Sequence, residues 1–429
     1  MHFSNLMRRT TSIHDHSKVA TDAIVDALRS RHKAIKALQQ VLERHQASNL
    51  SAENPDEKDA LLATVLFFIN FDLIDSGKGG WRTHMKAARA LLAAQASNFA
   101  PLSRMVEEEV APTDISPPTA EPCSDVLTTI SGRNTRPVLN TSHEIGIRDY
   151  IASDSVAYYI WGTTLDCLSK SASRSGGDPV DTADLQHILD RTEANSYHSC
   201  PANILLLILR TSRLAKDIYG NGALTPRPEQ MDSFMDLLRE AQTFDPEAWA
   251  RAISMANSHV IEADEAEIRV RTCAAATYRA TACLYVLLLA PGLQEHIRKK
   301  TQYSAGGSDL PFLPTAADLT STILQYLSRI PKSSPLFRYS SWPVFMTGVE
   351  ANTPESRAWI LDRLGAMWEI CPWGMMKSAM ETLTRVWKVR DGMLEDASDN
   401  EQQNDQTGLA VDGNSLVQLR SMGIEFLIV

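Results

Sequence analysis

The sequence lacks the short cysteine spacings of a zinc site. Its 429 residues include six cysteines, and these are scattered: Cys123, Cys167, Cys200, Cys273, Cys283 and Cys371. Even the closest two, Cys273 and Cys283, have nine residues between them, whereas a zinc site needs one local turn to present two thiolates to the metal. We therefore expect no zinc site. The scatter is typical of reduced, buried thiols in an intracellular protein.

An excess of basic residues is also missing. The chain has 42 Lys and Arg against 52 Asp and Glu, for a formal charge of −10. Non-specific binding to nucleic acid comes mainly from basic groups that neutralise phosphates. The short basic runs at residues 8–9 and 298–300 are interpreted as solvated surface rather than as a nuclear import signal. The sequence therefore predicts no residues that bind DNA directly.

The sequence predicts no membrane-spanning segment. Residues 1–9 lack the apolar stretch of a secretory signal. The most membrane-like run, residues 282–290, covers nine positions, while a bilayer needs about 20. A buried helix is the better interpretation of that run, and no membrane contact is expected.

Recognisable catalytic motifs are missing as well. The chain contains no G-x-S-x-G, Walker, G-x-G-x-x-G or H-E-x-x-H pattern. His14 and His16 are the nearest approach to a metal pair, but no cysteines accompany them. Asp72, Asp75 and the acidic residues of 262–267 do not form the paired motif with which all-α isoprenoid enzymes hold magnesium. The sequence thus predicts no catalytic residue, metal ligand or cofactor, and no enzyme.

Apolar residues at helical spacing are present over most of the chain. In residues 20–46 they recur at intervals of three, four and seven, which predicts an amphipathic helix. Residues 62–73 predict a second helix that ends at the glycines of 76–80, and a third begins at Trp81. Because the loop between these two helices is short, they are expected to form an antiparallel hairpin.

The same periodicity predicts the later helices. Their expected ranges are 147–171, 182–192, 202–218, 228–243, 246–256, 262–289, 316–330, 354–370 and 373–390. Pro343 biases Trp342 toward an extended conformation, so this ring is expected to lead into the next helix and wedge between its neighbours. No alternating strand pattern and no fixed repeat is present. The predicted fold class is all-α.

The predicted organisation is one large domain of antiparallel helices, with two lobes as an alternative. A flexible N-terminus (1–19) precedes a helical domain (20–391). Within that domain, residues 101–145 contain six prolines and predict a flexible loop. Residues 392–429 are expected to be an acidic flexible tail, for which a weak acidic-hydrophobic activation segment is the sharper interpretation.

Several segments, in this order along the chain, resemble the regulatory domain of fungal-specific transcription factors. This helical module usually follows a binuclear zinc cluster. The resemblance covers roughly residues 20–391, and it includes an early hairpin with a tryptophan, a Cys-Pro entry to a buried helix, and a long central helix. The residues that carry it, with an expected structural role, are Trp81, His84, Cys200, Pro201, Trp342, Pro343, Gly348, Arg357, Trp359 and Trp387.

The resemblance implies a transcriptional regulator or co-regulator, in the nucleus or also in the cytoplasm. Its implied partners are other transcription regulators, a homo- or heterodimer partner, or a small-molecule effector, and regulation of a secondary-metabolite gene cluster follows by analogy. The family's zinc cluster needs six cysteines in one N-terminal segment, but the first cysteine here is Cys123. We therefore expect either a shortened member or a chain without its upstream domain.

Two alternatives remain open at this point. One is a helical scaffold or inhibitor that pairs with a zinc-cluster transcription factor. The other is an all-α biosynthetic enzyme. Four or more ionisable side chains around one deep pocket would favour the enzyme, whereas a pocket lined by apolar and aromatic residues would favour effector binding.

Overall fold

Helices make up the regular structure of the part of the chain that the computed structural model describes. The described residues are 18–47, 55–78, 80–91, 146–166, 182–193, 199–220, 225–257, 264–303, 314–400 and 428–429. No extended strand occurs within these ranges, and the all-α prediction is confirmed. The predicted loop at 101–145 and residues 1–17 and 401–427 of the two ends lie outside the described residues.

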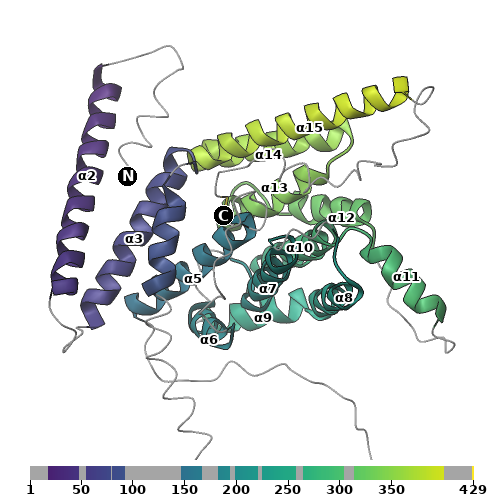
Figure 1. Cartoon of the computed structure of the whole chain (residues 1–429), viewed down its shortest axis with the longest axis horizontal. Coiled ribbons are helices and arrows are strands. Elements are labelled where there is room, and N and C mark those ends of the chain that lie inside the picture. Colours follow the sequence, from purple (N-terminus) through teal and green to yellow (C-terminus); the bar gives the residue numbers. More distant parts are fainter. Residues whose placement is uncertain are drawn as a thin grey trace, which may run out of the picture.

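The helices follow one another around a shared interior (Figure 1). They are α2 (Lys18–Ala47), α3 (Pro55–Asp75), α5 (Ile147–Asp166), α6 (Thr182–Thr192), α7 (Ala202–Tyr219), α8 (Pro228–Thr243), α9 (Pro246–Asn257), α10 (Glu265–Leu289), α11 (Leu293–Tyr303), α12 (Ala316–Ser328), α13 (Ser341–Glu350), α14 (Pro354–Ile370) and α15 (Gly374–Asn400). The 3₁₀ helix η2 (Pro335–Ser340) precedes α13, and a further helix covers residues 81–91.

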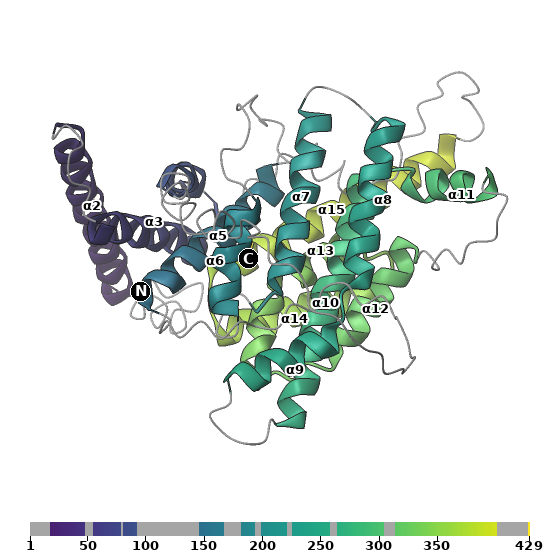
Figure 2. The same cartoon turned by 90° about the horizontal axis from the view of Figure 1, so that it is seen from below.

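The centre of the fold is α10, which packs against α7, α8, α9, α12 and α13. Figure 2 shows α7, α8 and α9 gathered around it. By length and composition alone α10 could cross a membrane, but 83% of its most apolar window is buried inside the protein. Small residues such as Ala275 and Ala282, both fully buried, allow neighbouring helices to approach closely. This helix is therefore the core of the domain.

The first and last parts of the helical chain meet. The helices α14 and α15 lie along one side of the molecule (Figure 1), and α15 also packs against α3. A Cβ atom at Gly374 would lie 1.9 Å from the carbonyl oxygen of Asp75, so the start of α15 touches the end of α3 backbone to backbone. Only glycine fits this approach.

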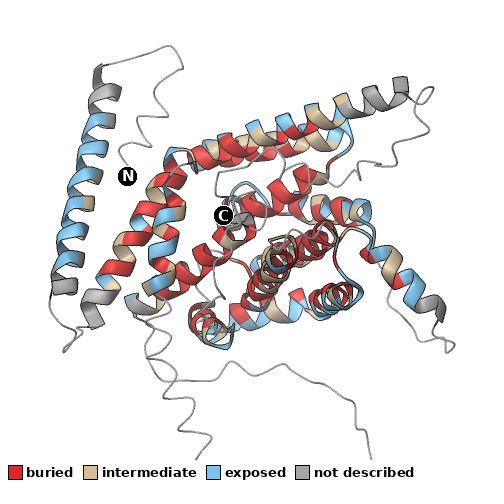
Figure 3. Ribbon diagram, viewed as in Figure 1, coloured by how far each residue is buried: buried red, intermediate tan, exposed pale blue. Residues whose placement is uncertain are grey.

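The buried side chains form one connected cluster that includes residues from α3 to Ile428. Figure 3 shows buried residues through the inner helices, whereas the described part of α2 is mainly exposed. The largest fully buried side chains are Trp81, Trp161, Trp342, Tyr158, Tyr285, Phe234, Phe337 and Phe345. A tryptophan ring buries a large apolar area, and these three tryptophans are part of the core.

The ends of the domain differ from the prediction. The helix α15 continues to Asn400, so residues 392–400 of the predicted flexible tail are helical. This stretch has no proline, and helix formers follow Gly392, so nothing in it stops a helix that already packs on the domain. Ile428 and Val429, at the end of the same predicted tail, are buried. At the other end, α2 begins at Lys18, inside the predicted N-terminal segment.

One local prediction was also wrong, and one helix was missed. Trp342 is not extended: it lies in the first turn of α13, together with Pro343. Proline is tolerated there because the first N–H groups of a helix have no partner within it. In addition, α11 was not predicted, because its mainly polar sequence carries little apolar periodicity.

Candidate functional site

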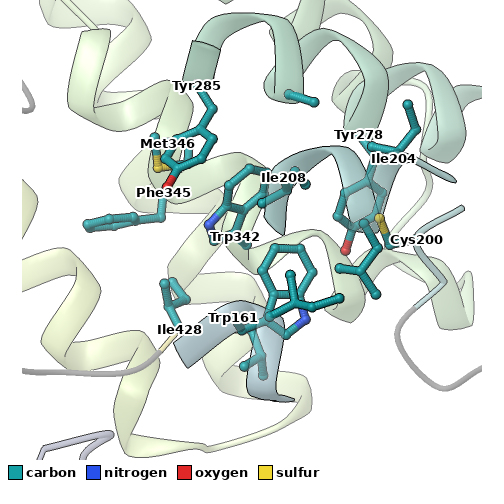
Figure 4. Packing of buried hydrophobic residues seen from close by; sticks show 14 of the residues in the cluster. Trp161, Cys200, Ile204, Ile208, Tyr278, Tyr285, Trp342, Phe345, Met346 and Ile428 are labelled. Carbon is teal, nitrogen blue, oxygen red and sulfur yellow. The ribbon is translucent and has the colours of Figure 1, made fainter. Parts of the chain in front are cut away.

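Four aromatic side chains from three helices meet at the centre of the domain. Trp161 of α5 and Trp342 of α13 have ring centroids 5.0 Å apart. Tyr285 of α10 meets Trp342 edge-on at 5.8 Å, and Tyr278 lies 6.4 Å from Trp161. Figure 4 shows these rings together. Trp342 therefore wedges between neighbouring elements, as the sequence predicted, although its backbone is helical.

Tyr278 is a neutral hydrogen-bond donor in this cluster. Its hydroxyl donates to the carbonyl oxygen of Tyr339 over 2.5 Å, and burial raises its pKa well above the usual value. The hydroxyl of Tyr285 lies 2.9 Å from that of Ser212. These phenols are thus satisfied inside the protein. Neither the pKa of Tyr278 nor its geometry is that of a proton-transfer group at neutral pH.

Trp81 and His84 build the early helical hairpin. Trp81 is fully buried, and an added Cβ at Gly162 would meet its ring at 3.3 Å, which places Trp81 against α5. The ring of His84 stacks on Phe68 of α3, with centroids 5.1 Å apart. Burial lowers the pKa of His84, and the charge of Arg31 lowers it further. His84 is therefore a neutral packing residue at pH 7.

A buried ion pair joins α2 to this hairpin. Arg31 donates to Asp72 over 2.8 Å, and the Asp72 side chain is 4% exposed. Burial raises the pKa of Asp72, while the charge of Arg31 acts in the opposite direction. From the sequence, Asp72 was weighed as a metal ligand and was not predicted as one, and in the structure Asp72 pairs with Arg31.

Cys200 and Pro201 mark the entry to α7, as the resemblance predicted. Cys200 is buried, and burial raises the pKa of its thiol well above the usual value, so it remains a neutral thiol. The carboxylate of Glu193 accepts the backbone N–H of Ala202 at 2.7 Å and the indole N–H of Trp249 at 2.9 Å. Glu193 thus caps α7 from a distance, a role that no local pattern in the sequence reveals.

The C-terminal signature residues converge on one network. Trp387 of α15 donates its indole N–H to the carbonyl oxygen of Gly348 at 2.9 Å. Arg357 of α14 forms two hydrogen bonds to Asp391, at 2.7 and 2.9 Å, and a third to the carbonyl oxygen of Ala351 at 3.2 Å. The guanidinium of Arg357 also lies 5.4 Å from the ring centre of Trp387. These contacts join α13, α14 and α15.

Trp359 belongs to a neighbouring cluster around a buried arginine. Arg363 is 6% exposed, and its guanidinium lies 3.9 Å from the ring centre of Phe337 and 5.7 Å from that of Trp359. It donates to the carbonyl oxygen of Ile330 at 3.2 Å. Burial lowers the pKa of Arg363 to about 10, so it stays charged at pH 7. Arg363 was not predicted from the sequence, because a single arginine within a helix forms no pattern that indicates a site.

A pocket opens beside the aromatic cluster. It has a volume of about 410 Å³, including space open to solvent. Its walls come from α5, α10, η2, the α14–α15 connection, the start of α15 and the end of the chain: Trp161, Tyr278, Arg338, Tyr339, Cys371, Trp373, Met375, Met376 and Val429. Most of these side chains are aromatic or apolar, and Arg338 is the one basic or acidic residue among them. Across the described residues, no three His, Cys, Asp or Glu side chains are placed to hold a metal ion.

The signature residues therefore divide among several places. Gly348, Arg357 and Trp387 form one network, Trp342 belongs to the aromatic cluster, and the others hold separate helix contacts. None of the ten lines the pocket. The pocket residues were not predicted as a site, because they come from distant parts of the sequence. A site of this kind can bind an apolar molecule.

The described helices thus form an all-α domain with buried tryptophans and a mainly aromatic and apolar pocket. The model of the fungal specific transcription factor domain matches residues 6–405. The chain therefore belongs to this family of transcription regulators, which confirms the resemblance.

The chain is also similar in sequence to a protein of Neurospora crassa. The chain is 29% identical over 373 residues to the acriflavine sensitivity control protein acr-2 of Neurospora crassa, over 86% of this chain and 51% of that protein. The chain thus spans about half the length of this relative. No solved structure matches it significantly.

Proposed function

We propose that this chain is a nuclear transcriptional regulator whose helical domain binds a small apolar effector. The observation that carries the proposal is the lining of the pocket by aromatic and apolar side chains, with Arg338 as its single basic or acidic residue. The pocket does have four ionisable side chains, those of Arg338, Tyr278, Tyr339 and Cys371. None is a His, Asp or Glu, the groups that most often transfer protons in enzymes, whereas ligand pockets are mostly apolar and aromatic with few polar groups. The lining therefore supports effector binding over catalysis.

The position of the pocket supports a regulatory effect of such a ligand. Trp161 belongs to α5, Tyr278 to α10, Tyr339 to η2, and Met375 to α15. A ligand that contacts all four elements stabilises the arrangement in which they meet. By differential affinity it shifts the domain toward that arrangement. The change in arrangement exposes or covers surfaces of these helices, and so alters whether other transcription regulators can bind them.

Deletion of the gene, followed by transcript profiling, tests the regulatory role. We expect a defined set of transcripts to change, and a tagged chain to be in the nucleus. The affected genes will also show whether a secondary-metabolite cluster is under its control. Purely cytosolic protein together with unchanged transcripts would refute the proposal.

Complementation of the deletion tests the pocket itself. Cys371→Trp adds a large ring at the pocket wall and should abolish the transcript response at unchanged protein level. Ile370→Trp is the matched control, because Ile370 is the neighbouring residue, is 41% exposed and does not line the pocket. Purification of the tagged chain tests the partners: recovery of a zinc-cluster transcription factor would favour the alternative of a helical inhibitor.

A further inference from the structure

Trp161 carries a buried hydrogen-bond donor without an acceptor. The residue is 1% exposed, and its indole nitrogen has no hydrogen-bond partner among the described residues. Buried N–H groups, those of tryptophan included, nearly always have a partner. An exception of this kind indicates a partner that the described residues do not supply.

This donor belongs to a wall of the pocket. Trp161 lines the pocket together with Tyr278 and Tyr339, and in Figure 4 its indole nitrogen lies on the side of the ring toward Tyr278 rather than toward Ile428. Neighbouring donors already have acceptors. The hydroxyl of Tyr278 donates to the carbonyl oxygen of Tyr339, and Arg338 donates to the hydroxyl of Tyr339 at 2.7 Å.

The rest of the lining indicates the shape and charge of the ligand. The aromatic rings of Tyr278 and Trp373 favour stacking or edge contacts with a flat molecule. Met375 and Met376 adapt to ring edges through their flexible, polarizable side chains. Arg338 is exposed, and its positive charge disfavours a cation in the pocket. A neutral or anionic ligand therefore suits this lining.

We propose that the pocket selects a planar aromatic molecule bearing a hydrogen-bond acceptor such as a ketone oxygen, and that the indole N–H of Trp161 binds this acceptor. The inference rests on the proposed effector function and adds the chemical class of the ligand. A ligand oxygen at Trp161 would satisfy a buried polar group of the cluster that has no hydrogen-bond partner among the described residues. Specificity then comes from a single directional contact inside an otherwise apolar site.

Two probes that differ only in the acceptor test the proposal. The first is 6-propionyl-2-(dimethylamino)naphthalene, which carries a ketone, and the second is 6-propyl-2-(dimethylamino)naphthalene, in which a CH2 group replaces the C=O. Titration calorimetry with the full chain should show about five- to tenfold tighter binding of the ketone, the effect of one hydrogen bond. In Trp161→Phe, which keeps a ring but removes the N–H, the two probes should bind equally. Trp368→Phe, outside the pocket, should preserve the difference.

The outcomes separate this inference from the proposed function. Equal binding of both probes to the wild-type chain would overturn the acceptor contact and leave an apolar effector pocket standing. A ketone preference that persists in Trp161→Phe would assign the contact to another residue and also overturn it. If Trp161→Phe does not fold, Cys371→Trp replaces it: loss of both probes supports the pocket, and retention of either overturns the site.

Discussion

Trp387 of α15 and Gly348 of α13 are joined by a hydrogen bond of 2.9 Å from the indole N–H to the backbone carbonyl oxygen. The close approach depends on glycine, since a Cβ atom at position 348 would lie 2.6 Å from a methyl carbon of Leu383. Arg357 covers Trp387 and pairs with Asp391. The C-terminal signature of the family, as this chain carries it, therefore describes helix packing rather than contact with a ligand.

Gly348→Ala is expected to lower the free energy of unfolding by about 1–3 kcal/mol, because the added methyl group forces Leu383 out of its position. Gly365→Ala is the matched control. Gly365 lies inside α14 with no atom within 4 Å of an added Cβ, so alanine there should raise stability by up to about 1 kcal/mol. Urea unfolding followed by circular dichroism measures both. Equal effects of the two substitutions would contradict the close contact.

Arg31→Met should lower the free energy of unfolding by about 2–4 kcal/mol, because it leaves the buried Asp72 carboxylate without its cation. The double variant Arg31→Met/Asp72→Leu should recover most of this loss. Arg29→Met is the control, since Arg29 forms a pair with Asp26 in which both side chains are more than 60% exposed, and it should change stability by less than about 0.5 kcal/mol. A double variant as unstable as Arg31→Met would show that packing, rather than the unpaired charge, causes the loss.

Asp154 should make stability depend on pH. Burial raises its pKa to about 6 from the usual 3.8, so the folded protein binds this proton more tightly than the unfolded chain. The resulting stabilisation is complete below about pH 4 and is lost as the pH rises through 6. Asp154→Asn stays neutral, and should equal the wild type near pH 4 and exceed its stability at pH 7 by at most about 3 kcal/mol.

Urea unfolding of wild type and Asp154→Asn at pH 4, 5, 6 and 7 measures this difference. Asp236→Asn, at an aspartate whose side chain is 72% exposed, controls for the loss of one negative charge. A difference between wild type and Asp154→Asn that does not change with pH would contradict the assignment.

Ile428→Ala should lower the free energy of unfolding by about 1–3 kcal/mol, less than in a helix interior because the short end segment can adjust. Ile428 is fully buried, and the hydroxyl of Ser341 donates to the carbonyl oxygen of Val429. Val25→Ala on α2, at a side chain that is 43% exposed, should cost less than about 0.5 kcal/mol. If both variants unfold like the wild type, the end segment does not contribute to the core in solution.

Much of the helical structure follows from local sequence. The predicted ranges 182–192, 228–243 and 354–370 agree with the bounds of α6, α8 and α14. Proline in the first turn starts α8 and α14, since its missing N–H needs no partner there. The polar helix α11 and the continuation of α15 were not predicted. Tertiary contacts hold a polar helix in place, and the spacing of its apolar residues does not indicate those contacts.

The sequence by itself determined the all-α class and the order of the family's motifs, because helical periodicity and cap residues act within a few turns of the chain. Only the tertiary structure decided which side chains share a site. Trp161, Tyr278, Trp373 and Val429 are far apart in the sequence and meet in one pocket, and Glu193 caps a helix that begins nine residues after it. Whether a buried polar group has a hydrogen-bond partner depends on how the whole domain packs. The spacing of residues along the chain does not predict that partner.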